Sequence, residues 1–481
     1  MIEMSLAEAA RAMHAAAPSV PAVAALTFQG VGTDSRALSP GGLFVALSGP
    51  RFDGHAFLAA AQARGAVAAV VAAARLAQGD QAGSAAQAGL IRPEGLPLLA
   101  VADPRLALGA LAAAWRRHFA LPLVAVTGSN GKTTVKEMVA AILAPLGPVL
   151  ANRGNLNNDI GLPLTLLGLG PEHRHGVVEM GANHAGEIAV LAGIARPAVA
   201  VVTCTAPAHL EGFGDLAGVR RAKAEIYAGL APGGVAVVNA EDGIAPLAER
   251  AAGHRWVLRF GMDAPAAAIR AAECRLAPEG SEFLLVTPAG WAEVRLPIPG
   301  RHNIMNALAA AACAHALGVA PAAVAAGLAG FAGVAGRLKP RDGIAGARIL
   351  DDTYNANPGS LAAGIEVLGR YPGRHWLCLG DMGELGPESW ALHAAMGRQA
   401  RVAGVERLFA VGELMRGAVA AFGDGAGHYG DAQALTAAVV AELAGCQAAG
   451  PAVAGITVLV KGSRAMRMEQ VVAGLGAGPV E

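Results

Sequence analysis

A glycine loop follows an apolar strand near residue 127 and carries residue types that bind phosphate. The segment from Val124 to Thr134 reads Val-Ala-Val-Thr-Gly-Ser-Asn-Gly-Lys-Thr-Thr. Glycines allow the backbone to wrap around a phosphate, and the amides of a following helix N-terminus direct positive charge at it. A tight strand-to-helix turn with a surface lysine is the alternative. The candidate nucleotide-binding residues are Thr127, Gly128, Ser129, Asn130, Gly131, Lys132, Thr133 and Thr134.

Within this loop, Lys132 can neutralise the β and γ oxygens of a nucleotide and Thr133 can reach a metal ion. A helix after the loop is predicted because apolar residues recur at i, i+3, i+4 and i+7 from Val135 to Ile142. The loop departs from the pattern G-x-x-x-x-G-K-[ST], since Val126 occupies the place of the first glycine. The remaining pattern is T-G-x-N-G-K-T-T.

Three further residues could do chemistry beside this loop. Glu179 follows the apolar residues Val177 and Val178, which puts a carboxylate at the C-terminal end of a strand, where α/β sheets bind ligands. We expect it to bind magnesium. His209 also follows a predicted strand, but a lone histidine is usually structural and magnesium prefers oxygen ligands. Lys223 lies on a predicted helix, and its pattern alone indicates a solvated side chain.

Lysine and asparagine are used sparingly, which marks the positions where they occur. Of the 37 basic residues only five are lysine: Lys132, Lys136, Lys223, Lys339 and Lys461. A chain that uses arginine elsewhere is expected to keep lysine where a compact or deprotonatable amine is needed. All eleven asparagines lie between Asn130 and Asn357, mostly in short polar clusters. This clustering indicates binding sites rather than general surface polarity.

The elements that must position these residues alternate between strands and helices, which predicts mostly parallel sheets covered by helices. Near the N-terminus we expect a strand at Leu43–Leu47, a helix at His55–Arg64, a strand at Val67–Val71 and an exposed loop at Gly79–Gly95. The other predicted strands are Val124–Val126, Gly176–Met180, Val199–Thr203, Val235–Val238, Ile349–Leu350, Trp376–Leu379, Leu408–Val411 and Ile456–Val460.

Length and composition favour a chain of several α/β domains. With 481 residues it exceeds what one core usually supports, and about three domains are expected. The 64 glycines and 4% aromatic residues are typical of a tightly turned α/β protein rather than a β-sandwich. Because 37 basic and 37 acidic residues cancel, net charge gives no reason to expect a nucleic acid partner.

The sequence predicts a cytoplasmic protein without a membrane span. Five scattered cysteines, with no C-x-x-C pair, fit a reducing compartment, and the residues after Met1 lack the pattern of a signal peptide. The segment Ile304–Gly336 has no charged residue and is long enough to span a bilayer. It is rich in alanine and glycine and contains Pro321, so we interpret it as a buried helix, a turn and a second helix.

Together these residues resemble the Mur ligase family, over nearly the whole chain. The resemblance is carried by Thr33–Arg36, the phosphate loop, Asn155–Asn158 with Gly161 and Pro163, Glu179–Asn183, Ala208–Leu210, Lys223–Glu225, Gly300–Asn303, Gly336–Arg337, Asp351–Pro358 and Lys461–Arg464.

The resemblance implies an α/β protein of three domains. An N-terminal α/β domain (1–120) would hold a UDP-sugar, a central P-loop domain with a mostly parallel sheet (121–335) would bind ATP, and a C-terminal Rossmann-like domain (336–481) would receive the incoming amine. The implied enzyme is a monomeric ligase of peptidoglycan precursor synthesis that uses ATP and Mg²⁺ and forms an acyl phosphate. The Asp-Asn-Pro-Arg signature of the member that adds a diamino residue is absent. That favours UDP-N-acetylmuramoyl-tripeptide and D-alanyl-D-alanine as the substrates.

The resemblance also assigns roles to single residues. The lysine that matches Lys223 carries a carbamate in the family, and the histidine that matches His209 is a metal ligand. The implied catalytic residues are Lys132, Glu179, His209 and Lys223, and the implied metal-binding residues are Thr133, Glu179, His209 and Lys223. For ATP the resemblance adds Asn303 at the adenine, Arg337 at the phosphates and Asp352 at the ribose. For the substrates it adds Asp34, Ser35, Arg36, Asn157, Asn158, Asn355 and Asn357.

Two other functions remain compatible with the phosphate loop. A folylpolyglutamate synthase would share the ATP site but not Asp34–Arg36 or the asparagine-rich segment, and it should bind pterin compounds. A P-loop switch or regulatory module would hold a nucleotide without needing a carboxylate and an amine together. Substrate-dependent phosphate release separates these alternatives.

Overall fold

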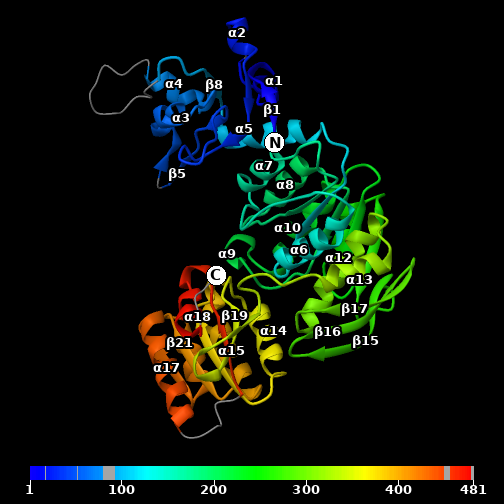
Figure 1. Ribbon diagram of the computed structural model, residues 1–481, viewed down its shortest axis with the longest axis vertical. Coiled ribbons are helices and arrows are strands. Elements are labelled where there is room, and N and C mark those ends of the chain that lie inside the picture. Colours follow the sequence, from blue (N-terminus) through cyan, green and yellow to red (C-terminus); the bar gives the residue numbers. More distant parts are fainter. Residues whose placement is uncertain (17, 51, 80–92, 449–454, 478–481) are drawn as a thin grey trace.

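The computed structural model describes residues 1–16, 18–50, 52–79, 93–448 and 455–477. Within these residues the strands form three main sheets that follow one another along the chain, together with two-stranded ribbons near the N-terminus. Figure 1 shows the sheets in three bodies, from the blue N-terminal body through the green central body to the yellow and red C-terminal body. This architecture confirms the predicted α/β fold. Most of the predicted loop at residues 79–95 lies outside the described residues.

The N-terminal body is built on a small parallel sheet. Its elements are β1 (Glu3–Ser5), α1 (Leu6–Ala12), α2 (Pro21–Ala24), β2 (Thr27–Gln29), β3 (Val31–Gly32), β4 (Leu43–Val45), β5 (Ser48–Gly49), β6 (Phe52–Asp53), α3 (Leu58–Ala63), β7 (Ala68–Ala72), α4 (Ala73–Gly79), β8 (Leu98–Val101) and α5 (Pro104–Arg116). The sheet order is β3-β4-β7-β8, so both predicted strands, at β4 and β7, are confirmed. The predicted helix starts as a 3-10 turn, where the Asp53 carboxylate accepts the backbone N–H of His55, and continues as α3.

Helix α5 fixes the N-terminal body to the central one. It begins after Asp103, whose carboxylate accepts the backbone N–H of Arg105 at 2.7 Å and so caps the helix. At its other end the buried guanidinium of Arg116 donates to the carbonyl oxygens of Ala195 at 3.1 Å and Leu121 at 3.0 Å. Both acceptors belong to the central body, and the carbonyl oxygen of Phe119 accepts from the same guanidinium at 2.5 Å, so the buried charge is satisfied by backbone carbonyls on both sides of this junction.

The central body contains the longest sheet of the described chain. Its elements are β9 (Leu123–Thr127), α6 (Lys132–Leu143), β10 (Val149–Ala151), α7 (Gly161–Leu166), β11 (His175–Glu179), α8 (Glu187–Ala195), β12 (Val199–Val202), α9 (Leu210–Phe213), α10 (Leu216–Ala228), β13 (Val235–Asn239), α11 (Ala245–Ala252), β14 (Trp256–Gly261), β15 (Ile269–Ala277), β16 (Gly280–Thr287), β17 (Gly290–Leu296), α12 (Arg301–Ala316) and α13 (Pro321–Ala329). The order is β10-β11-β9-β12-β13-β14-β15-β16-β17. Pairing is parallel from β10 to β15 and antiparallel for β16 and β17. All four predicted central strands are present.

Strand β9 lies where the chain changes direction across the sheet. It pairs with β11 on one side and β12 on the other, so the crevice beyond its C-terminal end is a topological switch point. Alternate side chains of β9 serve two cores. Leu123 and Ala125 pack in the cluster of α8 and α10, whereas Val124 and Val126 pack in the cluster of α6 and α12. The strand is therefore held rigidly on both faces directly before the phosphate loop.

The uncharged segment Ile304–Gly336 forms two buried helices, as predicted. Helix α12 is buried along most of its length, the chain turns at Gly318 with a φ of +81°, and α13 starts with Pro321 at its first position. Both helices pack against α6 and the sheet. Across the described ranges no helix is long and apolar enough to cross a membrane.

The C-terminal body is a sheet covered by helices on both faces. Its elements are β18 (Lys339–Asp342), β19 (Arg348–Asp352), α14 (Pro358–Leu368), β20 (Arg374–Gly380), α15 (Ser389–Val402), β21 (Arg407–Val411), α16 (Met415–Phe422), β22 (Ala426–Tyr429), α17 (Ala432–Ala448), β23 (Ile456–Lys461) and α18 (Glu469–Leu475). The order is β18-β19-β23-β20-β21-β22, and all pairs except β18-β19 are parallel. Helices α14, α15 and α16 share one core and α17 and α18 another. This is the predicted Rossmann-like arrangement.

Candidate active site

Two glycines let the loop between β9 and α6 pass close to its neighbours. Gly128 has a φ of +148°, and a Cβ there would lie 1.9 Å from the hydroxyl of Thr203. Gly131 has a φ of +78°, and a Cβ there would lie 2.3 Å from the side-chain oxygen of Asn306. Both positions therefore require glycine. Val126, by contrast, is a buried β9 residue, which explains why no glycine is needed at that place.

The continuation of β12 holds the phosphate loop in shape. The hydroxyl of Thr203 donates to the carbonyl oxygen of Asn130 at 2.5 Å, and the hydroxyl of Ser129 donates to that of Ala206 at 3.0 Å. On the other side, Thr127 donates to the carbonyl oxygen of Met180 at 2.7 Å. These hydrogen bonds fix the shape of the loop, as a phosphate cradle requires.

Lys132 is the first residue of α6 and its amine turns back over the loop. The amine donates to the carbonyl oxygen of Gly128 at 2.9 Å. Burial lowers the pKa of Lys132, while the nearby carboxylate of Glu179 opposes that shift and Arg337 adds to it. Lys132 and Arg337, which come from two different bodies, therefore place two cations near each other.

Glu179 is buried at the end of β11 and is held by amide and hydroxyl donors. Thr133 donates its hydroxyl to one carboxylate oxygen at 2.8 Å, and Asn157 donates its amide to the other at 2.7 Å. The amide of Asn152 pairs with the backbone of Glu179 at 2.9 and 3.0 Å. Because carboxylate and hydroxyl oxygens are the ligands that Mg²⁺ prefers, this donor set fits a magnesium ion. Within the described residues, no group of three or more acidic, histidine or cysteine side chains could hold a metal ion.

His209 joins the central body to the C-terminal body. Its backbone φ is +54°, and that of Glu384 is +61°, a conformation uncommon for residues with a side chain. The two side chains form an ion-pair contact through Nδ1 of His209, and the N–H of Leu210 donates to the carbonyl oxygen of Glu384 at 3.1 Å. Burial lowers the pKa of His209, and the charge of Glu384 opposes this shift. Strained residues that meet across two bodies are typical of functional sites.

Lys223 is buried, so the interpretation of this residue as solvated was wrong. It lies on α10 with only 2% of its surface exposed, and its amine is 5.3 Å from the centre of the Phe213 ring. Burial lowers its pKa to about 7, and repulsion by Lys132 adds to the shift. The pattern of one helix does not encode this tertiary packing. The packing favours the neutral form of the Lys223 amine.

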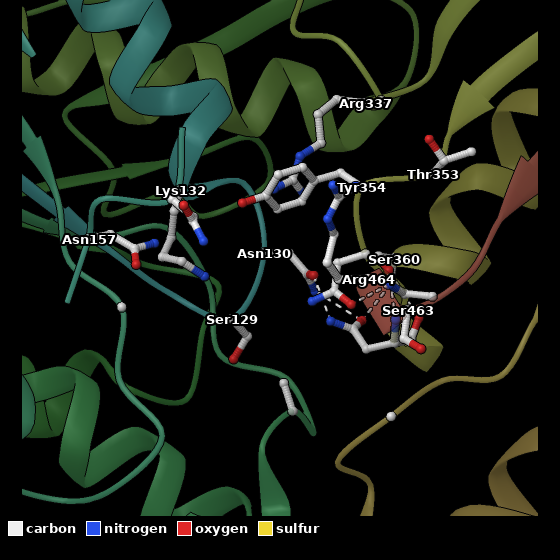
Figure 2. Close-up of a pocket in the computed structure, with 18 of the residues that line it drawn as sticks. Ser129, Asn130, Lys132, Asn157, Arg337, Thr353, Tyr354, Ser360, Ser463 and Arg464 are labelled. Carbon is white, nitrogen blue, oxygen red and sulfur yellow. Dashed lines mark hydrogen bonds between the residues drawn. The ribbon is translucent and has the colours of Figure 1, made fainter. Parts of the chain in front are cut away.

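These residues surround one cavity of about 980 Å³ between the central and C-terminal bodies. Figure 2 shows Lys132, Asn157 and Ser129 on one side of it, and Tyr354, Ser463 and Arg464 on the other. The predicted site residues that line the cavity are Ser129, Asn130, Gly131, Lys132, Asn157, Asn158, Glu179, His209, Lys223, Arg337, Asn355 and Asn357.

Other predicted site residues lie behind the cavity wall. Thr127, Gly128, Thr133 and Thr134 shape or support the loop from behind. Asn303 is buried, donates to the carbonyl oxygen of Pro299 at 2.7 Å, and accepts from Asn306, which touches Gly131. Asp352 is enclosed, and accepts from the buried amine of Lys461 at 2.5 Å. That amine also donates to the carbonyl oxygen of Asn355 at 2.9 Å, so the pair supports the cavity wall.

Asp34, Ser35 and Arg36 lie in the N-terminal body and do not line this cavity. The guanidinium of Arg36 donates to both carboxylate oxygens of Asp34, at 2.9 and 2.7 Å, and lowers the pKa of that carboxyl to about 2. Both side chains are exposed, whereas Ser35 is buried.

The phosphate loop also contacts the C-terminal body directly. The amides of Asn130 and Asn357 exchange two hydrogen bonds, of 3.3 and 2.8 Å. Asn357 is at the same time the N-cap of α14, where it accepts the N–H of Ser360 at 2.9 Å. Asn357 therefore links the start of α14 in the C-terminal body to the phosphate loop of the central body.

The residues missed by sequence reasoning include Asn152, Tyr354 and Glu384. Tyr354 lies under the guanidinium of Arg337, 4.2 Å from its carbon atom to the ring centre. The sequence offered a signal for Glu384, because this carboxylate comes soon after the apolar strand β20. Glu179 was predicted from the same kind of position, at the end of β11. Nothing in the spacing of Asn152 indicated its pairing with Glu179.

Comparisons with known proteins match all three bodies of this architecture. The family model of the Mur ligase family catalytic domain matches residues 27–116, that of the Mur ligase middle domain 126–314, and that of the Mur ligase glutamate ligase domain 336–464. A UDP-N-acetylmuramoyl-tripeptide--D-alanyl-D-alanine ligase of Escherichia coli (strain K12) is 45% identical over 452 residues, which cover 94% of each chain.

Solved structures agree with this match. A crystal structure of MurF from Acinetobacter baumannii superimposes with a TM-score of 0.87 at 36% identity and covers 98% of both chains. MurF ligase from Thermotoga maritima, solved in complex with ADP, has a TM-score of 0.76 at 26% identity and covers 93% of this chain and 96% of that one.

Proposed function

Because this chain belongs to the Mur ligase family, we propose that it joins D-alanyl-D-alanine to UDP-N-acetylmuramoyl-tripeptide, with ATP, in peptidoglycan precursor synthesis. The observation that carries the proposal is the cavity, in which the phosphate loop of a chain 45% identical to such a ligase faces a C-terminal wall able to receive an amine. ATP is the nucleotide, since a relative of the same fold is solved with ADP.

The chemistry begins at the phosphate loop. A carboxylate oxygen of the tripeptide attacks the γ-phosphorus of ATP, the bond to the β–γ bridging oxygen breaks, and ADP leaves. Lys132 and the loop amides stabilise the charge that spreads over the transferred phosphoryl group. Arg337, which lines the same cavity as Lys132, would stabilise the same charge. The product is an acyl phosphate and no covalent bond to the protein is formed.

The second step joins the amine. The amino group of D-alanyl-D-alanine attacks the acyl carbon, inorganic phosphate leaves, and the amine gives up a proton. Water would hydrolyse the acyl phosphate, so the C-terminal body must close over the cavity. The contacts of Asn130 with Asn357 and of His209 with Glu384 hold such a closed arrangement.

We propose Mg²⁺ as the second cofactor, held by Thr133 and Glu179 together with His209 and Lys223. When bound, the ion would neutralise phosphate oxygens as a Lewis acid. Lys223 can serve only as a carbamate, formed when its neutral amine adds CO₂ and releases one proton. Its lowered pKa supplies that neutral amine near pH 7.

The remaining predicted residues keep their roles as proposals. Asp34, Ser35 and Arg36 would bind the UDP part, and Asn157 and Asn158 the sugar side. Asn355 and Asn357 would contact the dipeptide side of the cavity. Asn303 would act at the adenine through Asn306, and Asp352 at the ribose edge by supporting residues 353–357 through Lys461.

We also propose domain limits of 1–120, 121–335 and 336–481, a monomer, and a cytoplasmic location. The three sheets fall within those limits, and the five cysteines are free.

The direct test is product analysis by mass spectrometry after incubation with ATP, Mg²⁺, the UDP-sugar tripeptide and D-alanyl-D-alanine. We expect UDP-N-acetylmuramoyl-pentapeptide and ADP in equal amounts. Lys132→Ala should abolish turnover but leave UDP-sugar binding largely intact, because the amine of Lys132 is hydrogen-bonded to Gly128 of the phosphate loop and would act on the phosphates. Equal loss of both would contradict the assignment. Glutamate addition to a pterin substrate would instead support a folylpolyglutamate synthase, and nucleotide binding without any product a P-loop switch.

A further inference from the structure

The C-terminal wall of the cavity carries three guanidinium groups, and two of them are already engaged. Arg337 lies over the Tyr354 ring and its charge acts on Lys132, so we group it with the phosphate loop. Arg341 donates from Nε to Asp351 at 3.2 Å, and only 7% of that carboxylate side chain is exposed. Drawing Arg341 away would leave a buried carboxylate unpaired, which is strongly unfavourable. Arg464 is the third.

Arg464 has a fixed backbone and an exposed side chain with one weak ion pair. It follows β23, and the turn before it is fixed by the N–H of Ser463, which donates to the carbonyl oxygen of Asp381 at 3.0 Å. About two thirds of its side chain (66%) is exposed, and its ion-pair partner is Glu469 at 3.3 Å. An exposed pair of this kind contributes about 0–1 kcal/mol, so it yields readily to a better-placed anion.

Its position suits the far end of the incoming substrate. Figure 2 shows Arg464 and Ser463 across the cavity from Lys132. The amine of a dipeptide must reach the acyl phosphate beside Lys132, and an extended dipeptide places its carboxylate about 7 Å further on. Because Arg337 and Arg341 are engaged by Tyr354 and Asp351, Arg464 is the guanidinium of this wall that can pair with that carboxylate. A guanidinium matches it with two parallel hydrogen bonds.

We propose that Arg464, beside Ser463, binds the C-terminal carboxylate of the incoming dipeptide and so selects a dipeptide acid. The inference rests on the proposed function, because it concerns the amine substrate of that reaction. Arg464 acts on the substrate at a distance from the reacting atoms. Its removal should therefore raise the KM for the dipeptide far more than it lowers kcat.

The test compares D-alanyl-D-alanine with its C-terminal amide, which lacks the negative charge. Wild-type protein should use the acid with a kcat/KM about 10- to 100-fold above that of the amide, as expected for a hydrogen-bonded charge pair. Arg464→Ala should lose most of this preference and leave the KM values of ATP and the UDP-sugar tripeptide within about twofold. Arg464→Lys should keep part of the preference for the acid, because lysine keeps the positive charge but cannot donate two parallel hydrogen bonds to one carboxylate.

Arg416→Ala is the matched control. Arg416 forms a similar exposed pair with Glu413, at 3.1 Å, in the same body but away from the cavity wall, so the preference should not change. The proposal is overturned if Arg464→Ala lowers kcat/KM equally for acid and amide, or raises the KM of the tripeptide instead. If the wild-type protein turns over neither dipeptide, the proposed function itself is refuted. This outcome differs from those that overturn only the role of Arg464.

Discussion

Replacing Lys223 by methionine should stabilise the protein, and do so most at low pH. Lys223 is buried, with 2% of its surface exposed, and none of the hydrogen bonds found among the described residues involves its amine. Burial, together with repulsion by Lys132, lowers its pKa from 10.5 to about 7. At 1.36 kcal/mol per unit, burying the charged amine destabilises the folded state by about 5 kcal/mol. Methionine has a similar volume and carries no charge.

The sign of the pH dependence follows from the two pKa values. Between pH 7 and 10.5 the unfolded chain binds a proton that the folded chain lacks, so wild-type stability rises with pH in this window. Below pH 7 both states hold the proton and the penalty is complete. The gain in free energy of unfolding from Lys223→Met, relative to wild type, should therefore be largest at pH 6. At pH 9.5 this gain should be smaller by about 3 kcal/mol. Lys132 repels this amine, and Glu187, Glu225 and Glu179 attract it.

Thermal unfolding in CO₂-free buffer measures this difference. For a body of about 200 residues, 5 kcal/mol corresponds to a rise in Tm on the order of 10 °C at pH 6. Lys136→Met is the control, because Lys136 is equally buried but donates to the carbonyl oxygen of Asn152 at 2.6 Å and pairs with Glu137 at 2.7 Å. That variant should be less stable than wild type. A Tm difference for Lys223→Met that does not change with pH would refute the reasoning.

Three further predictions follow from the same geometry. Lys223→Ala should lose activity and recover part of it with added short-chain carboxylic acids; full activity without the acid would exclude a carbamate. Gly131→Ala should weaken ADP binding about tenfold or more in calorimetry while circular dichroism stays unchanged, since its φ of +78° and the side chain of Asn306 leave no room for a Cβ. Glu384→Ala should remove the contact with His209 and raise the KM for the dipeptide up to about fivefold; small-angle scattering should show a more open molecule, and an unchanged profile would count against a closing role.

The sequence predicted the elements whose signals are local. The phosphate loop, the strand before it and the helix after it follow from glycines and hydrophobic periodicity, and all are present. The antiparallel strands β15, β16 and β17 were not predicted, although buried residues alternate along β16 and β17. They extend a sheet that otherwise follows a β-α-β pattern. The alternation of strands and helices before them does not indicate the change from parallel to antiparallel pairing.

Features that depend on contacts between distant residues could not be predicted from pattern. The burial of Lys223 depends on Phe213 and on the packing of α10, and the enclosure of Asp352 depends on Lys461, 109 residues away. Asn357, predicted to bind substrate, also caps α14 and contacts Asn130. A single sequence shows which residue types are present but not which partners they meet.

The most direct test of the central claim is phosphate release from ATP and Mg²⁺ with UDP-N-acetylmuramoyl-tripeptide, measured with and without D-alanyl-D-alanine. If the chain is the ligase described here, sustained release requires both substrates. Release that needs the sugar peptide but a different amine would contradict the assignment of the dipeptide. Absence of release with any pair would contradict the ligase function itself.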